Sequence, residues 1–439
     1  MPRETNAALP QPVFSEPVPT QDPAGYSVPP DDQKLYTGIE ELLKKDVVGF
    51  DRSRAADSDL YPLQSAWGPR GADVVSALEG SGQIAFHALG DSGAAGMRTY
   101  PSEIKVADAV AADFHAAAPR DRPAFLFHLG DVVYNFGESS YYYDQFYDAY
   151  RDYPAPIFAI PGNHDSFVVP GTPAGREPLT TFTRNFCAPA PVVTPEAGSL
   201  HRTAMTQPGV YFALDAPFVR IIGLFSNALE DPGLISDEKG RWPAVPRFQL
   251  DFLAAQLARV RSEKYTGALI LAVHHPPFSY SAPNLAPGKH AGSAAMLAEI
   301  DAVCAAQGVY PHAFLSGHAH NYQRYTRVLA FGGREISVPF VVCGNGGHNV
   351  SPLVRASGQG AVPNGVDVSS LDRSTAVGAK SLVLEAHDQV NFGFLRIVVT
   401  KDEMSIGYQP VTPGKAGGDM VIINLAGHTV RRQRRGGRK

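Results

Sequence analysis

Cysteine is scarce in this chain, with Cys187, Cys304 and Cys343 the only three among 439 residues. Three cysteines are too few for a disulfide framework, so a hydrophobic core must stabilise the fold. Hydrophobic residues make up 44% of the chain and charged residues 18%, which is enough for a sizeable core. We therefore expect buried thiols, although one pair could still form a disulfide.

Long apolar runs are also absent. No run of about 18 apolar residues occurs, so no transmembrane helix and no membrane partner is expected. The residues after Met1 lead into a proline-rich stretch without an apolar h-region, so the sequence as it stands has no Sec-type signal peptide. We expect a cytoplasmic protein, or a secreted or periplasmic one if a signal was removed from the chain.

An excess of positive charge is missing too. The formal net charge is −5, which makes nucleic acid an unlikely partner. The exception is the end of the chain, where residues 431–439 read RRQRRGGRK. We interpret this basic tail as a solvated segment, and binding to a phosphate-rich partner is the alternative.

The length of the chain corresponds to about two or three domains, although a large α/β domain can also reach this size. Residues 1–32 resemble an extended proline-rich arm, and residues 33–80 a helical or irregular segment with helical spacing from Asp32 to Lys45. Strand-like and helix-like stretches alternate from Gln83, which predicts βαβ units and an α/β fold. We therefore expect a catalytic domain over 81–427, followed by the basic tail at 428–439.

Five short motifs each place polar side chains directly after a run of apolar residues. They are GDSG at 90–93, GDVVY at 130–134, GNHD at 162–165, HHPP at 274–277 and GHAH at 317–320. In parallel sheets such positions lie at the carboxyl ends of the strands, where active sites form. The glycines before the ligands fit sharp turns that carry each side chain out of its strand.

The side chains of these motifs suit two metal ions. Hydrolysis of a phosphoester is slow because the anionic oxygens repel an incoming hydroxide. Two metal ions about 3.5 to 4 Å apart neutralise those oxygens, generate hydroxide and align the attack. Carboxylate, phenol, amide and imidazole donors are the ligands that such ions require. The sequence therefore predicts a hydrolase of phosphate esters that uses two metals.

The five motifs resemble those of the metallophosphoesterase (calcineurin-like) superfamily and, within it, the purple acid phosphatases. Most of the superfamily begins with Asp-x-His, but here Gly93 stands two residues after Asp91. Tyr134 stands three residues after Asp131 instead, and this exchange of tyrosine for histidine is similar to the purple acid phosphatase pattern. The resemblance extends from about Gln83 to His348.

The resemblance implies a fold, a reaction and a set of metal ligands. The fold is a four-layer α/β/β/α sandwich with two mixed sheets. The reaction is hydrolysis of small-molecule phosphate monoesters, with a metal-bound hydroxide attacking phosphorus. The first metal, iron(III) because a phenolate binds it, would be held by Asp91, Tyr134 and His320. The second, a divalent Fe, Zn or Mn ion, would be held by Asn163, His274 and His318, with Asp131 bridging the two.

The same resemblance implies roles for side chains beside the ligands. His164 would contact the phosphoryl group or protonate the leaving oxygen, and Asp165 would orient His164. His275 is the alternative to His274 as ligand, and otherwise would support the ligands or face the substrate. Two other functions stay open: a phosphodiesterase acting on nucleotides or glycerophosphodiesters, and an inactive scaffold that binds proteins.

Overall fold

The computed structural model of the chain describes residues 60–94, 96, 98–166, 178–280, 290–353, 366–367, 379–411 and 418–431. The expected arm at 1–32, the helix expected at Asp32–Lys45 and residues 432–439 of the basic tail lie outside the described residues. Among the described residues, no helix combines the length and the apolar content needed to cross a membrane. All three cysteines are buried thiols, as expected.

One of the two sheets has seven strands in the order β16-β15-β14-β13-β2-β3-β4. Its parallel half consists of β2 (Gln83–Leu89), β3 (Pro123–His128) and β4 (Ile157–Ala159). Its antiparallel half consists of β13 (Gly393–Thr400), β14 (Glu403–Pro410), β15 (Asp419–Asn424) and β16 (Thr429–Val430). Strands β13 and β14 form an antiparallel hairpin near the C-terminus.

The second sheet has nine strands in the order β1-β5-β6-β7-β8-β10-β9-β12-β11. Strands β6 (Val219–Leu224), β7 (Ala268–Val273), β8 (Ala313–Ser316) and β10 (Arg334–Cys343) run parallel. The remaining strands are β1 (Leu60–Pro62), β5 (Phe212–Ala216), β9 (Tyr322–Phe331), β11 (Val366–Asp367) and β12 (Ala379–Asp388). Strand β1 pairs with β5, so residues 60–62 of the expected N-terminal segment belong to this sheet.

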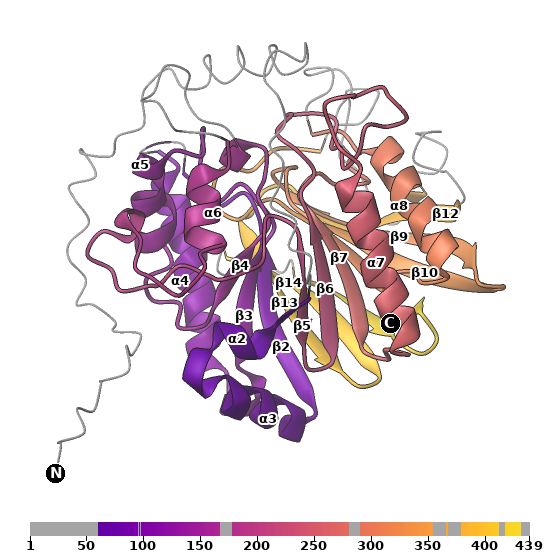
Figure 1. Ribbon diagram of the computed structural model, residues 1–439, viewed down its shortest axis with the longest axis horizontal. Helices are drawn as coiled ribbons and strands as arrows, with labels where there is room; N and C mark the ends of the chain where they lie inside the picture. Colours follow the sequence, from indigo (N-terminus) through magenta and orange to yellow (C-terminus); the bar gives the residue numbers. More distant parts are fainter. Residues whose placement is uncertain are drawn as a thin grey trace, which may run out of the picture.

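Helices cover the outer face of each sheet, as Figure 1 shows. The seven-stranded sheet is covered by α4 (Tyr100–Ala116), α5 (Ser139–Tyr142), the π-helix η4 (Tyr143–Asp148) and α6 (Thr180–Phe186). The nine-stranded sheet is covered by α7 (Phe248–Ser262) and α8 (Ala294–Gln307). The shorter elements are α2 (Leu63–Ala66), η2 (Gly68–Arg70), α3 (Gly71–Ser81), η3 (Pro119–Asp121), η5 (His164–Ser166) and η6 (Pro195–Ala197).

Three hydrophobic clusters fill the three spaces between these four layers. Along β2, alternate residues Ile84, Phe86 and Ala88 point between the two sheets, whereas Leu89 points toward α4. The third cluster lies between the nine-stranded sheet and the two helices α7 and α8. The period of two in β2 reflects the alternation of side chains across a strand. The expected four-layer α/β/β/α sandwich with two mixed sheets is confirmed.

Candidate metal centre

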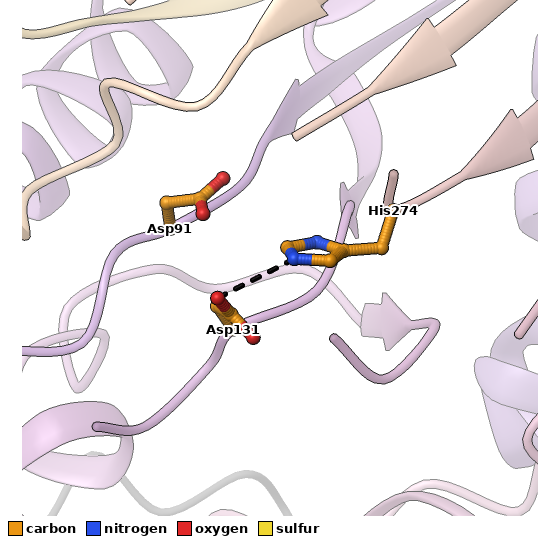
Figure 2. Close-up of side chains that lie close together, drawn as sticks. All are labelled: Asp91, Asp131 and His274. Carbon is orange, nitrogen blue, oxygen red and sulfur yellow. Dashed lines mark ion pairs between the residues drawn. The ribbon is translucent and has the colours of Figure 1, made fainter. Parts of the chain in front are cut away.

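The seven predicted metal ligands lie in loops at the carboxyl ends of the central strands. In chain order these are Asp91 after β2, Asp131 and Tyr134 after β3, Asn163 after β4, His274 after β7, and His318 and His320 after β8. Figure 2 shows three of them, with His274 reaching from the second sheet toward the two carboxylates of the first. Ligand atoms of Asp91, Asp131 and His274 all lie within 4.8 Å of one another. The structure therefore brings the motifs of both sheets to one place.

The backbone of the ligands themselves makes the sharp turns. Asp91, Asp131 and His318 have φ values of 58°, 54° and 68°, in the left-handed region that side chains rarely adopt. Of the glycines that precede ligands, Gly130 has a left-handed φ, at 99°. Such strain costs about 1 to 3 kcal/mol per residue and persists where the surroundings impose it. The expectation that glycine supplies these turns is therefore corrected for most of the loops.

The glycines are needed for space instead. A Cβ on Gly162 would lie 2.5 Å from the Asp131 nitrogen and would overlap its carboxylate. A Cβ on Gly317 would lie 2.5 Å from Oδ2 of Asp91. Contacts shorter than 3.0 Å essentially do not occur for real Cβ atoms, so any larger residue would displace a carboxylate. Glycine at these positions lets two loops approach the ligands closely.

The Tyr134 phenol lies at the centre of the first group of ligands. Its oxygen is 2.8 Å from Oδ2 of Asp131 and 3.0 Å from Oδ1 of Asp91. Nε2 of His320 lies 3.2 Å from the same oxygen, and Nδ1 of that ring is 2.5 Å from Oδ1 of Asn349. The three predicted ligands of the first metal and the predicted bridging carboxylate thus meet around one phenol oxygen.

The Asn163 amide lies at the centre of the second group. Its Oδ1 is 3.1 Å from Nε2 of His274 and 3.2 Å from Nδ1 of His318. Nε2 of His274 is also 3.4 Å from Oδ2 of Asp131, which connects the second group to the first. Asp131 therefore lies between the two groups, where a bridging ligand would have to be.

The two adjacent histidines face different ways. Nδ1 of His274 lies 2.8 Å from the Leu129 carbonyl, which can only accept a hydrogen bond, so Nε2 is left to face Asn163 and Asp131. His275 instead has Nδ1 at 2.7 Å from the Ser226 hydroxyl and Nε2 at 2.8 Å from the Leu229 carbonyl. Both ring nitrogens of His275 are therefore engaged by a neighbouring loop.

Burial of so many ionisable groups shifts their pKa values strongly. Burial raises the pKa of Asp91 to about 7, with His274 opposing the shift and Asp131 adding to it. Burial opposes protonation of His274, but the carboxylates of Asp131 and Asp91 raise its pKa to about 9. Burial alone would raise the pKa of Asp131, whereas the adjacent His274 and His164 hold it below its usual range. Without metal, these shifts favour the charged forms of Asp131 and His274, whose Oδ2 and Nε2 atoms lie 3.4 Å apart.

The imidazoles of the two remaining histidine ligands, His318 and His320, are neutral. Burial lowers the pKa of His320 to about 3 and holds the pKa of His318 well below its usual value. Burial and the two neighbouring carboxylates raise the pKa of Tyr134 well above 10. The phenol therefore keeps its proton until a strong cation compensates the negative charge.

The Tyr134 ring is held between two imidazoles. The ring of His348 stacks on it at 3.7 Å between centroids and 12° between planes, and His164 lies against it at 4.2 Å. Nδ1 of His348 is 2.9 Å from the carbonyl of Gly93, the residue two positions after Asp91. The stack places the half-buried His348 beside the ligands, where it supports the Tyr134 ring.

His164 and Asp165 are fixed by different partners. Nδ1 of His164 lies 2.8 Å from the carbonyl of Asn135. The Asp165 carboxylate instead accepts hydrogen bonds from the backbone N–H groups of Val132, Val133 and Gly162, at 2.9 to 3.1 Å. Asp165 therefore ties the second and third motif loops together, and the contact that sets the His164 ring comes from a carbonyl.

The donor atoms are spaced as ligands of a metal ion would be. The seven donor-to-donor distances within the two groups run from 2.8 to 3.4 Å. Ligands bound at about 2.1 Å in octahedral geometry lie about 3 Å apart, so these residues fit such an ion. Buried carboxylates are stable only when paired or bound to metal, and oxygen and imidazole donors suit Fe, Zn and Mn. The residues present therefore fit a metal centre.

Comparison with known proteins identifies the domain. The chain matches the family described as calcineurin-like phosphoesterase over residues 86–322, more than half of its length. The chain belongs to the calcineurin-like phosphoesterase family. Membership makes the matched region a metallophosphoesterase domain, and the buried cluster of Asp91, Asp131 and His274 fits its use of metal.

Solved structures resemble the chain only distantly. A protein described as PhoD is 13% identical, with a TM-score of 0.44 over 81% of this chain and 73% of that one. GAP50, described as the anchor in the inner membrane complex of Plasmodium, is 12% identical, with a TM-score of 0.46 over 80% of this chain and 90% of that one. No curated protein matches the chain. At these scores neither neighbour bears on the activity.

Proposed function

We propose that this chain is a purple acid phosphatase-like enzyme that hydrolyses phosphate monoesters with two metal ions. The observation that carries the proposal is the Tyr134 phenol oxygen, which lies within 3.2 Å of donor atoms of Asp91, Asp131 and His320. A phenol in this position, where most of the superfamily would use a histidine after Asp91, supports the assignment within the family.

We assign the first ion to Asp91, Tyr134 and His320. The second ion is assigned to Asn163, His274 and His318, and the carboxylate between the two groups, Asp131, would bind both. A phenolate prefers a hard trivalent ion, so iron(III) is proposed beside Tyr134 and divalent Fe, Zn or Mn at the second site. When bound, the two ions would neutralise the phosphoryl oxygens, lower the pKa of water and align the nucleophile with the leaving group.

His164 is the proposed proton donor to the leaving oxygen. Its Nδ1 faces the Asn135 carbonyl, which can only accept, so Nδ1 carries a hydrogen and Nε2 is the atom that exchanges a proton. The packing of its ring on Tyr134 places it beside the first group of ligands. The contacts of Asp165 and His275 support positioning roles for both, through the motif loops and through the ring of His318.

Metal analysis and a visible spectrum of the purified protein test this proposal, together with turnover of an aryl phosphate monoester and an aryl phosphate diester. Two ions per chain, a purple or pink colour and faster turnover of the monoester are expected. The colour should vanish in Tyr134→Phe. It should persist in Tyr142→Phe, which removes an equally buried hydroxyl that has no hydrogen-bond partner among the described residues.

Each contrary result is informative. A colourless protein with two zinc or manganese ions would overturn iron(III) and keep the binuclear hydrolase. Faster turnover of the diester would favour the phosphodiesterase. A protein with neither metal nor turnover would overturn the proposed enzymatic function and favour the alternative of an inactive scaffold that binds proteins.

A further inference from the structure

His318 presents its two ring nitrogens to different surroundings. Nδ1 lies 3.2 Å from Oδ1 of Asn163, within the second group of ligands. An imidazole that binds an ion through Nδ1 must carry its hydrogen on Nε2. Nε2 of His318 is buried and has no hydrogen-bond partner among the described residues. A buried donor of this kind is costly, so an acceptor is needed on that side of the ring.

The carboxylate of Asp231 lies on that side. Its Oδ1 is 3.8 Å from Nε2 of His318, and only about 12% of the side chain is exposed. The same oxygen accepts a hydrogen bond of 3.0 Å from the backbone N–H of Ala291. Two independently placed loops, one after β6 and one after β7, thus meet at this carboxylate. Nothing in the five motifs marks Asp231, because it lies outside all of them.

Other groups that touch the His318 ring do not supply this acceptor. The ring of His275 packs on it at 4.1 Å, but both nitrogens of His275 bond to Ser226 and Leu229. The ring of His290 lies at 4.9 Å, with its Nε2 3.5 Å from Glu230. Asp231 is therefore the anionic acceptor toward which Nε2 of His318 is directed.

We propose that Asp231 is a positioning residue of the second metal site, acting through His318. A movement of less than about 1 Å closes the gap to a hydrogen bond from Nε2–H. That bond fixes the tautomer and the ring orientation that leave Nδ1 for the ion, and makes the imidazole a better ligand. The inference rests on the proposed function, because it requires an ion at the second site.

Metal binding to the wild type, Asp231→Ala and Asp231→Asn tests the proposal. Zinc affinity is measured by competition with a chelator, tyrosinate absorption of Tyr134 reports the first site, and thermal unfolding is followed without metal. Asp231→Ala should bind the second ion about 10- to 100-fold more weakly while the tyrosinate signal is retained. Asp231→Asn keeps an acceptor oxygen without the charge, so its affinity for the second ion should lie between those of Asp231→Ala and the wild type.

Asp237→Asn is the matched control. It neutralises another acid of the same loop, one that pairs with Arg247 instead. This variant should bind zinc at both sites with wild-type affinity. Asp231→Ala with wild-type affinity at both sites would overturn the inference. So would equal weakening of both sites with lower metal-free stability, which is the signature of a merely structural role. A wild type that fails to bind two ions would overturn the proposed function itself.

Discussion

Loading metal into the proposed centre should displace about 2.5 protons per chain from its ligand side chains at pH 7. With a pKa of about 9, His274 is almost fully protonated at pH 7 and loses about one proton when it binds. Asp91, with a pKa of about 7, contributes about half a proton. Tyr134, whose pKa is raised well above 10, contributes about one if it binds as phenolate. His318 and His320 are already neutral and contribute none.

The sign of the pH dependence follows from this count. The metal-free protein holds more protons than the loaded protein, so metal affinity falls as the pH falls. Near pH 7, the logarithm of the association constant should change by about two to three units per pH unit. Below pH 7, Asp91 becomes fully protonated and the slope steepens further. Metal affinity that rises as the pH falls would require groups that gain protons when metal binds, and none of the proposed ligands does so.

Isothermal titration calorimetry with zinc, in two buffers of different protonation enthalpy, measures the number of protons released on metal binding. Tyr134→Phe should release up to one proton fewer than the wild type, because it lacks the phenol proton. Loss of the phenol hydrogen bond also raises the pKa of Asp91, which returns part of this difference. Tyr142→Phe should release the wild-type number. Release of less than one proton, or equal release by the wild type and Tyr134→Phe, would refute the ligand assignment or the buried ion pair behind it.

Three further predictions concern stability and packing. Asp301→Asn should lower the free energy of unfolding by about 3 kcal/mol in denaturant titrations, because it leaves the guanidinium of the buried Arg327 without its bidentate carboxylate. Burial lowers the pKa of His312 to about 4 and of His428 to about 3. As the pH drops from 6.5 toward 4, these histidines are protonated in the unfolded chain before they are protonated in the folded one, so the free energy of unfolding should fall. His428→Asn should reduce this loss of stability. Gly162→Ala should abolish metal binding at both sites in metal analysis, while the far-ultraviolet circular dichroism stays that of the wild type.

The placement of the ligands could be predicted from the sequence because each of the five motifs follows an apolar run. A buried strand must end before a carboxylate such as Asp91 or Asp131, and parallel strands bring their carboxyl ends to one edge. The four layers were expected from the family resemblance, and the alternation of strands and helices pointed only to an α/β fold. The apolar run of β2 was visible in the sequence, but which face packs on which layer was not.

Other parts of the centre could not be predicted, because they depend on contacts between distant segments. The stack of His348 on Tyr134 joins two loops that no common pattern marks. The resemblance implied that Asp165 orients His164, and the structure adds that the Asp165 carboxylate accepts hydrogen bonds from three backbone N–H groups of the second and third motif loops. Glycine next to a ligand suggested a sharp turn, whereas Gly162 and Gly317 are needed for space. In each case the local sequence identified the residue and tertiary packing decided its role.

The left-handed backbones and the buried charges point to a centre that is preorganised by the sandwich. Asp91, Asp131 and His318 each carry about 1 to 3 kcal/mol of backbone strain, and none of them can relax without moving a ligand. Part of that cost is offset locally, since Oδ2 of Asp91 accepts a 2.7 Å hydrogen bond from the His318 backbone N–H. The rest must be offset by the three hydrophobic clusters, which must also offset the repulsion between Asp91 and Asp131 whenever both are charged. An ion that relieves this repulsion binds only the folded chain, so metal should raise the stability of the whole domain in proportion to the logarithm of its concentration.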